Sequence, residues 1–123
     1  MARRQLDEST PVFYFDPRVE VSPFALFRCF EEGRAPLLVD LRPAGGRLTF
    51  AGALPYPGPG WTPPTGRDVL VFDDDGTAAV GEARRLQAAG FSRVKALFGG
   101  IDLYELALDP QVVGPETHLR ETR

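Results

Sequence analysis

The stretch of residues 69–90 constrains the fold of this chain more than any other. It begins with four apolar residues, Val69 to Phe72, whose β-branched and aromatic types are typical of a strand buried on both faces. An acidic loop follows, and Ala79, Ala83 and Leu86 then recur with helical spacing up to a stop at Gly90. A strand, a short loop and a helix in this order place the loop where open α/β sheets keep their ligand sites. We therefore search for function in this loop first.

Composition limits the remaining possibilities. The chain has 123 residues, the size of one domain, and its only cysteine, Cys29, excludes an intrachain disulfide. It offers no cluster of cysteine and histidine that could hold zinc, and we expect no cofactor. A net charge of -3 and a pI near 5.1, with scattered arginines, argue against nucleic acid as a partner.

Two expectations concern where the protein works. The first residues lack the apolar run of a signal peptide, and nothing has the length of a membrane span, so we expect a cytoplasmic protein without a membrane partner. A single lysine, Lys95, beside many arginines, no asparagine and many prolines in loops suit a thermophile. We therefore predict a thermostable protein.

The rest of the chain alternates between strand and helix patterns. Strands are predicted at residues 12–15, 19–21, 36–42 and 91–98, and helices at residues 23–32 and 101–108. Ser22 is the expected N-cap of the first helix, ahead of Pro23 at its first position. Residues 48–54 are only weakly apolar, and residues 111–123 are interpreted as a polar tail. We expect one domain over residues 1–123, with its core at about residues 12–110.

Three features outside the acidic loop invite a functional interpretation. Cys29 lies within the first predicted helix, where no activating group is evident, so we interpret it as a small buried hydrophobe. His118, the only histidine, falls in the polar tail and is expected to be solvated, without a role. Residues 55–68, rich in proline and glycine with Tyr56 and Trp61 between them, form either a stiff connection or a surface for a partner.

Five segments in order, spanning residues 21–108, resemble the motifs of rhodanese-like domains. They are Val21-Ser22-Pro23, Leu38-Val39-Asp40-Leu41-Arg42, Gly52-Ala53, Ala88-Ala89-Gly90-Phe91 with Val94 and Leu97 after it, and Gly99-Gly100-Ile101-Asp102-Leu103-Tyr104. The resemblance implies a three-layer α/β fold with a five-stranded, mainly parallel sheet flanked by helices.

The departures from this resemblance fall on the chemistry. The position of the family's sulfur-carrying cysteine aligns with Asp73, and the position that closes its loop aligns with Ala78. The family's Gly-His pair reads Leu48-Thr49 here. A carboxylate cannot replace a thiolate nucleophile, and Cys29 lies on the wrong element. The resemblance therefore implies a rhodanese-like domain without sulfurtransferase activity.

The acidic loop remains the candidate binding site. Backbone N–H groups at a helix N-terminus form a cradle that favours negative charge, and the Asp73 carboxylate could occupy it. Asp74 and Asp75 would then make the rim acidic and favour a basic protein partner. The alternative is that the aspartates only cap the helix and stay solvated. The candidate residues are Asp73, Asp74, Asp75, Gly76, Thr77 and Ala78.

The same loop also resembles the first motif of haloacid-dehalogenase-type phosphatases, a strand followed by Asp-x-Asp-Gly-Thr. That resemblance implies a magnesium-dependent phosphotransferase with Asp73 as nucleophile and Asp75 as proton shuttle. The partners that such an enzyme needs downstream lack the expected spacing, since the chain offers only Ser92, Lys95, Asp102 and Asp109. The leading hypothesis is a non-catalytic, protein-binding or regulatory domain, and the phosphotransferase is the alternative.

Overall fold

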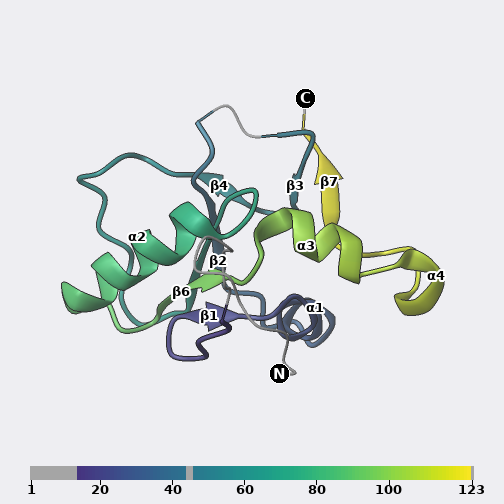
Figure 1. The fold of residues 1–123 in the computed structure, drawn as a ribbon, viewed down its shortest axis with the longest axis horizontal. Helices are drawn as coiled ribbons and strands as arrows, with labels where there is room; N and C mark the ends of the chain where they lie inside the picture. Colours follow the sequence, from purple (N-terminus) through teal and green to yellow (C-terminus); the bar gives the residue numbers. More distant parts are fainter. Residues whose placement is uncertain (1–13, 44–45, 123) are drawn as a thin grey trace, which may run out of the picture.

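A five-stranded parallel sheet forms the centre of the protein, as seen in a computed structural model that describes residues 14–43 and 46–122 (Figure 1). Its strands, in spatial order, are β1 (Glu20–Val21), β6 (Val94–Leu97), β5 (Val69–Phe72), β2 (Leu37–Asp40) and β4 (Leu54–Pro55). Each of the four strand pairings is parallel, so the predicted sheet is confirmed.

Strand β5 occupies the middle of the sheet, as its four consecutive apolar residues predict. All four of its residues are buried, because β2 and β6 pair with it on either side and helices cover both faces. The carboxyl end of β5 therefore opens directly into the acidic loop, at the centre of one edge of the sheet.

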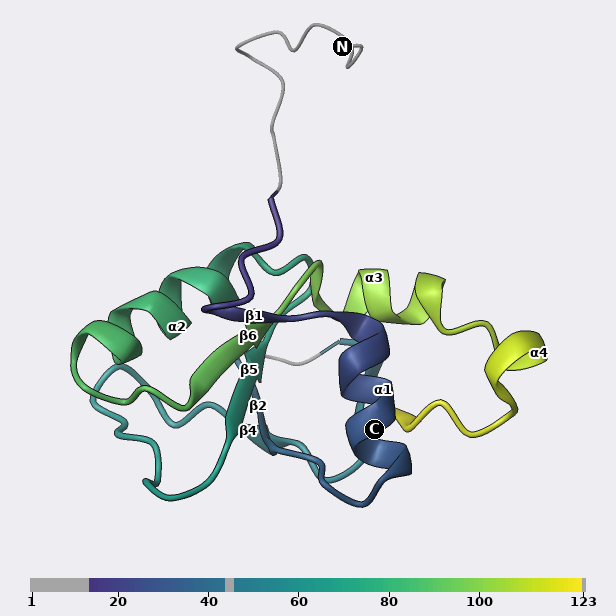
Figure 2. The ribbon, with the colours of Figure 1, turned by 90° about the horizontal axis from the view of Figure 1, so that it is seen from below.

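Helices cover the two faces of the sheet in three layers, which Figure 2 shows with the sheet seen edge-on. The helix α2 (Thr77–Ala88) covers one face, and α1 (Pro23–Glu31) and α3 (Gly100–Ala107) cover the other. Alternating strand residues divide the core accordingly: Val69 and Val71 pack with α2, whereas Leu70 and Phe72 pack with the α1 side. The expected α/β architecture is confirmed.

Local sequence signals position both long helices. Ser22 caps α1 by accepting a hydrogen bond from the N–H of Ala25, as predicted. In α2, the buried residues are Ala79, Ala83 and Leu86, the stripe that the helical spacing predicted. The small side chains of Ala79 and Ala83 let α2 lie close against β5 and β6.

The chain after α3 corrects two expectations. Residues 111–123 were interpreted as a polar tail, but a short helix α4 (Pro110–Val113) and a strand β7 (Leu119–Glu121) lie there. Strand β7 pairs antiparallel with β3 (Leu48–Phe50), and Leu119 packs against the core. A three-residue strand paired with another short strand has too little periodicity to be detected in a sequence.

His118 is the second correction, since it is not solvated. Its side chain is 16% exposed, stacks on Phe30 at 4.4 Å between ring centroids, and lies 2.7 Å from the Glu31 carboxylate. The histidine thus attaches the segment before β7 to α1. Its role in the structure is packing, which the lone histidine in a polar stretch did not reveal.

The strand predicted at residues 12–15 is not found where the structure describes it. Tyr14 and Phe15 have no strand pairing, and Val12 and Phe13 lie outside the described residues. Phe15 instead packs edge-on against Phe98, with 5.4 Å between the ring centroids. An aromatic cluster was mistaken for a strand because both have the same composition.

Residues 55–68 run along the surface, and their aromatic residues cover the α2 side of the core. Tyr56 and Trp61 pack edge to face, and the Tyr56 hydroxyl donates a hydrogen bond to Glu82 on α2. This arrangement agrees with the stiff-connection interpretation. Among the described residues, no helix has the length and apolar character needed to cross a membrane.

Candidate functional site

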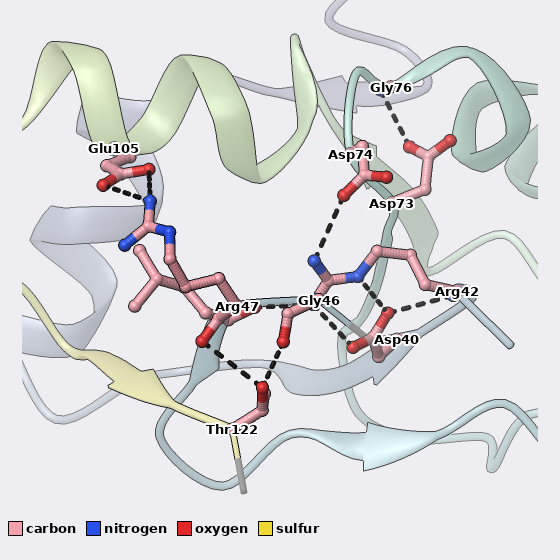
Figure 3. Close-up of polar contacts among 10 residues, drawn as sticks. Asp40, Arg42, Gly46, Arg47, Asp73, Asp74, Gly76, Glu105 and Thr122 are labelled. Atoms are coloured by element: carbon pink, nitrogen blue, oxygen red, sulfur yellow. Dashed lines mark hydrogen bonds and ion pairs between the residues drawn. The ribbon is translucent and has the colours of Figure 1, made fainter. Parts of the chain in front are cut away.

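Asp73 is buried in the loop between β5 and α2, with 8% of its surface exposed. The N–H of Gly76 donates to its Oδ1 at 2.8 Å (Figure 3), and the N–H of Ala78 donates to its Oδ2 at 2.9 Å. The expectation that the Asp73 carboxylate occupies the N–H cradle is therefore confirmed. Both of its oxygens are engaged by the chain's own backbone.

Two opposing effects act on the ionisation of this carboxyl. Burial raises the pKa of Asp73 above its usual value, and the N–H bonds from Ala78 and Gly76 partly offset this rise because they favour the carboxylate. The nearby charge of Asp75 adds to the increase in pKa. The two N–H donors match the carboxylate form of Asp73, and negative charge is what the N–H groups at a helix N-terminus favour.

Asp74 is exposed and pairs with Arg42, which follows β2 (Figure 3). The Arg42 guanidinium lies 3.1 Å from the Asp74 carboxylate and 2.8 Å from that of Asp40. Within this ion cluster the Arg42 and Asp40 side chains are largely removed from water, with 7% and 11% of each exposed, whereas the Asp74 side chain is 65% exposed. The cluster ties the end of β2 to the loop that follows β5.

Arg42 belongs to the site but is absent from the predicted site residues. Its guanidinium also donates to the carbonyl of Leu48 at 2.7 Å and lies over the Phe72 ring. The signal was present in the spacing of Asp40 and Arg42, two residues apart at a strand end, which places both side chains on the same side. Neither residue was assigned to the site because the acidic loop lies about thirty residues away in sequence.

Asp75 and Gly76 shape the start of α2. The N–H of Thr77 donates to Asp75 Oδ1 at 2.9 Å, and Gly76, with φ of 91°, is the N-cap. The aspartates thus satisfy N–H groups of the first helical turn from the loop, and α2 begins at Thr77, two residues before its first core residue. Capping is therefore present, while a binding role for the loop stays a prediction.

The loop is also bonded to the N-terminus of α3. The N–H of Ile101 donates to the Asp73 carbonyl and the N–H of Asp102 to the Asp74 carbonyl, both at 3.0 Å. Gly100 lies at this contact with φ of 67°, and a Cβ on it would overlap the Asp74 carbonyl. The helix start and the loop are therefore held together by backbone groups, which fixes the loop between α2 and α3.

A cleft of about 590 Å³ lies beside this loop and will be called the loop cleft. Its apolar wall consists of Tyr14, Val80, Phe98 and Leu103. Its charged residues are Glu20 and Asp75, together with Arg84, which forms a 3.7 Å ion pair with Asp16. None of the four wall residues was predicted as functional, because they come from four separate segments.

The structure does not bring the other predicted candidates to the loop as a group. Ser92 and Lys95 lie near the start of β5, at the opposite end of the strand from Asp73. Asp102 contacts the loop through its backbone, and Asp109 caps α4. Over residues 14–43 and 46–122, no group of three or more histidine, cysteine or acidic residues is arranged to hold a metal ion. The arrangement gives the phosphotransferase alternative no support.

Comparison with known proteins establishes the fold. No family model matches the sequence, and no curated protein matches it. The chain has a rhodanese-like α/β fold, because its structure is similar to that of a solved rhodanese domain. That structure is the one described as reduced Bacillus anthracis CoADR-RHD, with a TM-score of 0.54 and 23% sequence identity. The match covers 70% of this chain and 16% of the other.

Proposed function

We propose that this protein is a non-catalytic binding domain, which holds a cationic, partly apolar segment of a protein partner in the loop cleft. The observation that supports the proposal is the hydrogen bonding of Asp73, whose carboxylate accepts hydrogen bonds from the N–H groups of Gly76 and Ala78. The Asp73 carboxylate belongs to the same chain as these N–H groups and cannot diffuse away. An anionic substrate would therefore have to displace it from its hydrogen bonds. The loop is therefore better suited to forming a surface than to carrying a reacting group.

The charges around the loop favour a cationic partner. Two cations lie near the loop and both are paired: Arg42 with Asp40 and Asp74, and Arg84 with Asp16. Asp75 is exposed at the edge of the cleft, and its carboxylate accepts one backbone hydrogen bond among the described residues. A lysine or arginine of a partner could pair with it, and like-charged ligands would be repelled.

The apolar wall supplies the remaining recognition. Phe98 and Leu103 are half-buried, and Tyr14 is 74% exposed. Aromatic and aliphatic side chains around a concavity of this size are the usual lining of a binding site, and they fit an apolar side chain of the partner. A segment with a cation next to a leucine or phenylalanine matches both parts of the cleft.

A pair of peptides tests this proposal. Backbone amide shifts of isotope-labelled protein are recorded with a short peptide that alternates lysine and phenylalanine, and with its glutamate-for-lysine counterpart. We expect the basic peptide to shift the amides of Thr77, Val80 and Leu103, and the acidic one to leave them unchanged.

Two variants complete the design. Asp75→Asn should weaken binding of the basic peptide by about fivefold, since an exposed ion pair contributes at most about 1 kcal/mol. Asp68→Asn, which removes an exposed carboxylate at the far end of β5, is the matched control and should bind as the wild type does. Shifts spread evenly over the surface, or measurable sulfur transfer from thiosulfate to cyanide, would contradict the proposal.

A further inference from the structure

Lys95 occupies an unusual place in the sheet. It pairs in register with Leu70, and Leu97, two residues further along β6, is buried in the same core cluster as Leu70. Alternation along the strand therefore places Lys95 on the face that α1 and α3 cover. Lysine is depleted at such positions because its ammonium group must either lose its hydration or extend along the sheet to reach solvent. This lysine is also the only one in the chain.

A cleft opens where Lys95 lies, and it will be called the basic cleft. It has a volume of about 310 Å³, at the lower end of the range of small-molecule sites. Its apolar wall consists of Val21, Cys29 and Pro36, which are partly exposed, whereas Leu26 and Leu70 also border the cleft but are fully buried. An elongated apolar group would contact the three exposed residues of this wall.

Cations dominate the polar part of the basic cleft. Three basic side chains line it, those of Arg34, Arg93 and Lys95, against one carboxylate, that of Asp68. Arg93 is paired with Asp68 at 3.0 Å, and Arg34 with Glu32. The Lys95 ammonium donates to the Pro17 carbonyl at 3.0 Å, and over the described residues it forms no ion pair. Two of its three donors are thus available to a ligand.

We propose that the basic cleft binds a small amphipathic carboxylate, with the carboxylate on Lys95 and Arg93 and the hydrocarbon tail over the apolar wall. Charge complementarity selects the anion, and the apolar wall selects the tail. The basic cleft lies near Val69, where β5 begins, whereas the acidic loop follows Phe72, where β5 ends. The two sites are therefore separate, and this one does not depend on the function proposed for the loop cleft.

The test is a titration of the full chain with octanoate, followed by the backbone amide shifts of isotope-labelled protein. We expect saturable shifts at Cys29, Leu70 and Lys95. Acetate, which lacks the tail, and octyltrimethylammonium, which has a tail of the same length but the opposite charge, should each bind at least about tenfold more weakly. Equal binding of octanoate and the cationic analogue would overturn the proposal, and so would the absence of saturable octanoate shifts.

Variants test the contribution of the basic side chains separately from that of the hydrocarbon tail of the ligand. Lys95→Met keeps the length of the side chain and should weaken octanoate binding by about fivefold, whereas Lys95→Arg should retain it. Arg93→Gln, at an exposed position that cannot compromise the core, is the second variant and should also weaken binding. Arg85→Met, on α2 and therefore on the opposite face of the sheet, controls for total charge and should bind normally. Wild-type affinity in both Lys95→Met and Arg93→Gln would contradict the assignment.

Discussion

Asp73 and Arg42 show how single side chains define the character of this site. Asp73 is a buried carboxylate that accepts hydrogen bonds from two backbone N–H groups. Arg42 is a buried cation that contacts two carboxylates and one backbone carbonyl. Both side chains are satisfied by partners within the chain. Among the described residues, no buried side-chain nitrogen or oxygen lacks a hydrogen-bond partner. The site is therefore organised for rigidity and shape.

Removing the Arg42 guanidinium should destabilise the fold markedly. Arg42→Met leaves the Asp40 carboxylate buried without its partner, which we expect to lower the free energy of unfolding by about 3 kcal/mol. Arg42→Lys should recover less than half of the loss, since an ammonium group cannot bond both Asp40 oxygens at once as the planar guanidinium does. Chemical denaturation measures both changes.

The matched control for Arg42 is Arg47, which forms an ion pair with Glu105 on the surface (Figure 3). Because the Arg47 side chain is 69% exposed, Arg47→Met should change the free energy of unfolding by no more than about 0.5 kcal/mol. Equal losses for Arg42→Met and Arg47→Met would refute the role given to the buried cluster.

Two glycines provide a further contrast. Gly100→Ala places a Cβ on the Asp74 carbonyl at a left-handed backbone position, so we expect a loss of at least about 2 kcal/mol of unfolding free energy. Gly81→Ala lies within α2, where a Cβ meets open space, and should stabilise by about 0.5 to 1 kcal/mol. Thermal denaturation of both variants measures these effects. We expect the melting temperature to fall in Gly100→Ala and to rise in Gly81→Ala.

At the scale of elements, the loop is held by the helices on either side and by the strand that precedes it. Its side chains bond to the first turn of α2, and its carbonyls bond to the first turn of α3. Helix N-termini are positions where carboxylates and carbonyls are stabilised, because the N–H groups there have no partner within the helix. Both flanking helices therefore use the loop as their cap.

The C-terminal segment is a second element-scale feature, and its stability should depend on pH. The Arg120 guanidinium and the N–H of His118 bond the Glu116 carboxylate and lower its pKa to about 2. A folded-state pKa below the unfolded value stabilises the fold above about pH 4.5, and this contribution is lost as the pH falls towards 2.

We expect Glu116→Gln to remove this pH dependence. The difference in unfolding free energy between wild type and variant should be largest near neutral pH and should shrink as the pH falls from about 4.5 to 2. Urea denaturation at a series of pH values measures it. A difference that stays constant over this range would contradict the lowered folded-state pKa of Glu116.

The sequence predicted those elements whose signals are local. The stripe Ala79, Ala83 and Leu86 defined the buried face of α2, and the Ser22 cap placed the start of α1. Strand β7 and the stacked His118 were missed because their partners, β3 and Phe30, lie far away in the chain. The same reason explains the omission of Arg42, whose contact with Asp74 spans 32 positions. Long-range packing leaves little trace in local periodicity.

At the scale of the whole molecule, the two clefts lie near opposite ends of the same central strand. Asp75 and Gly76, beyond the end of β5, line the loop cleft, and Val69, at its beginning, lines the basic cleft. The two clefts are thus separated by the length of β5. If both proposals hold, the two ligands should bind independently, because neither cleft shares a lining residue with the other.

The composition predicts high thermal stability for this molecule. Its prolines lie largely in connections, and arginine replaces lysine almost throughout. We expect a melting midpoint above about 65 °C, beyond the usual range of mesophilic domains. Calorimetry of the full chain measures this value, and a midpoint between about 45 and 65 °C would remove the thermophile hypothesis.

We propose that the Asp73 carboxylate closes the N–H cradle of the loop to external anions. The most direct test is a titration with sodium sulfate at constant ionic strength, following the amide shifts of Gly76 and Ala78 in the wild type and in Asp73→Ala. We expect saturable shifts of both amides in Asp73→Ala, because the freed N–H groups donate hydrogen bonds to sulfate, and none in the wild type. Asp73→Ser is a second variant with the same expectation. Saturable sulfate binding at these amides in the wild type, or its absence in both variants, would contradict the account.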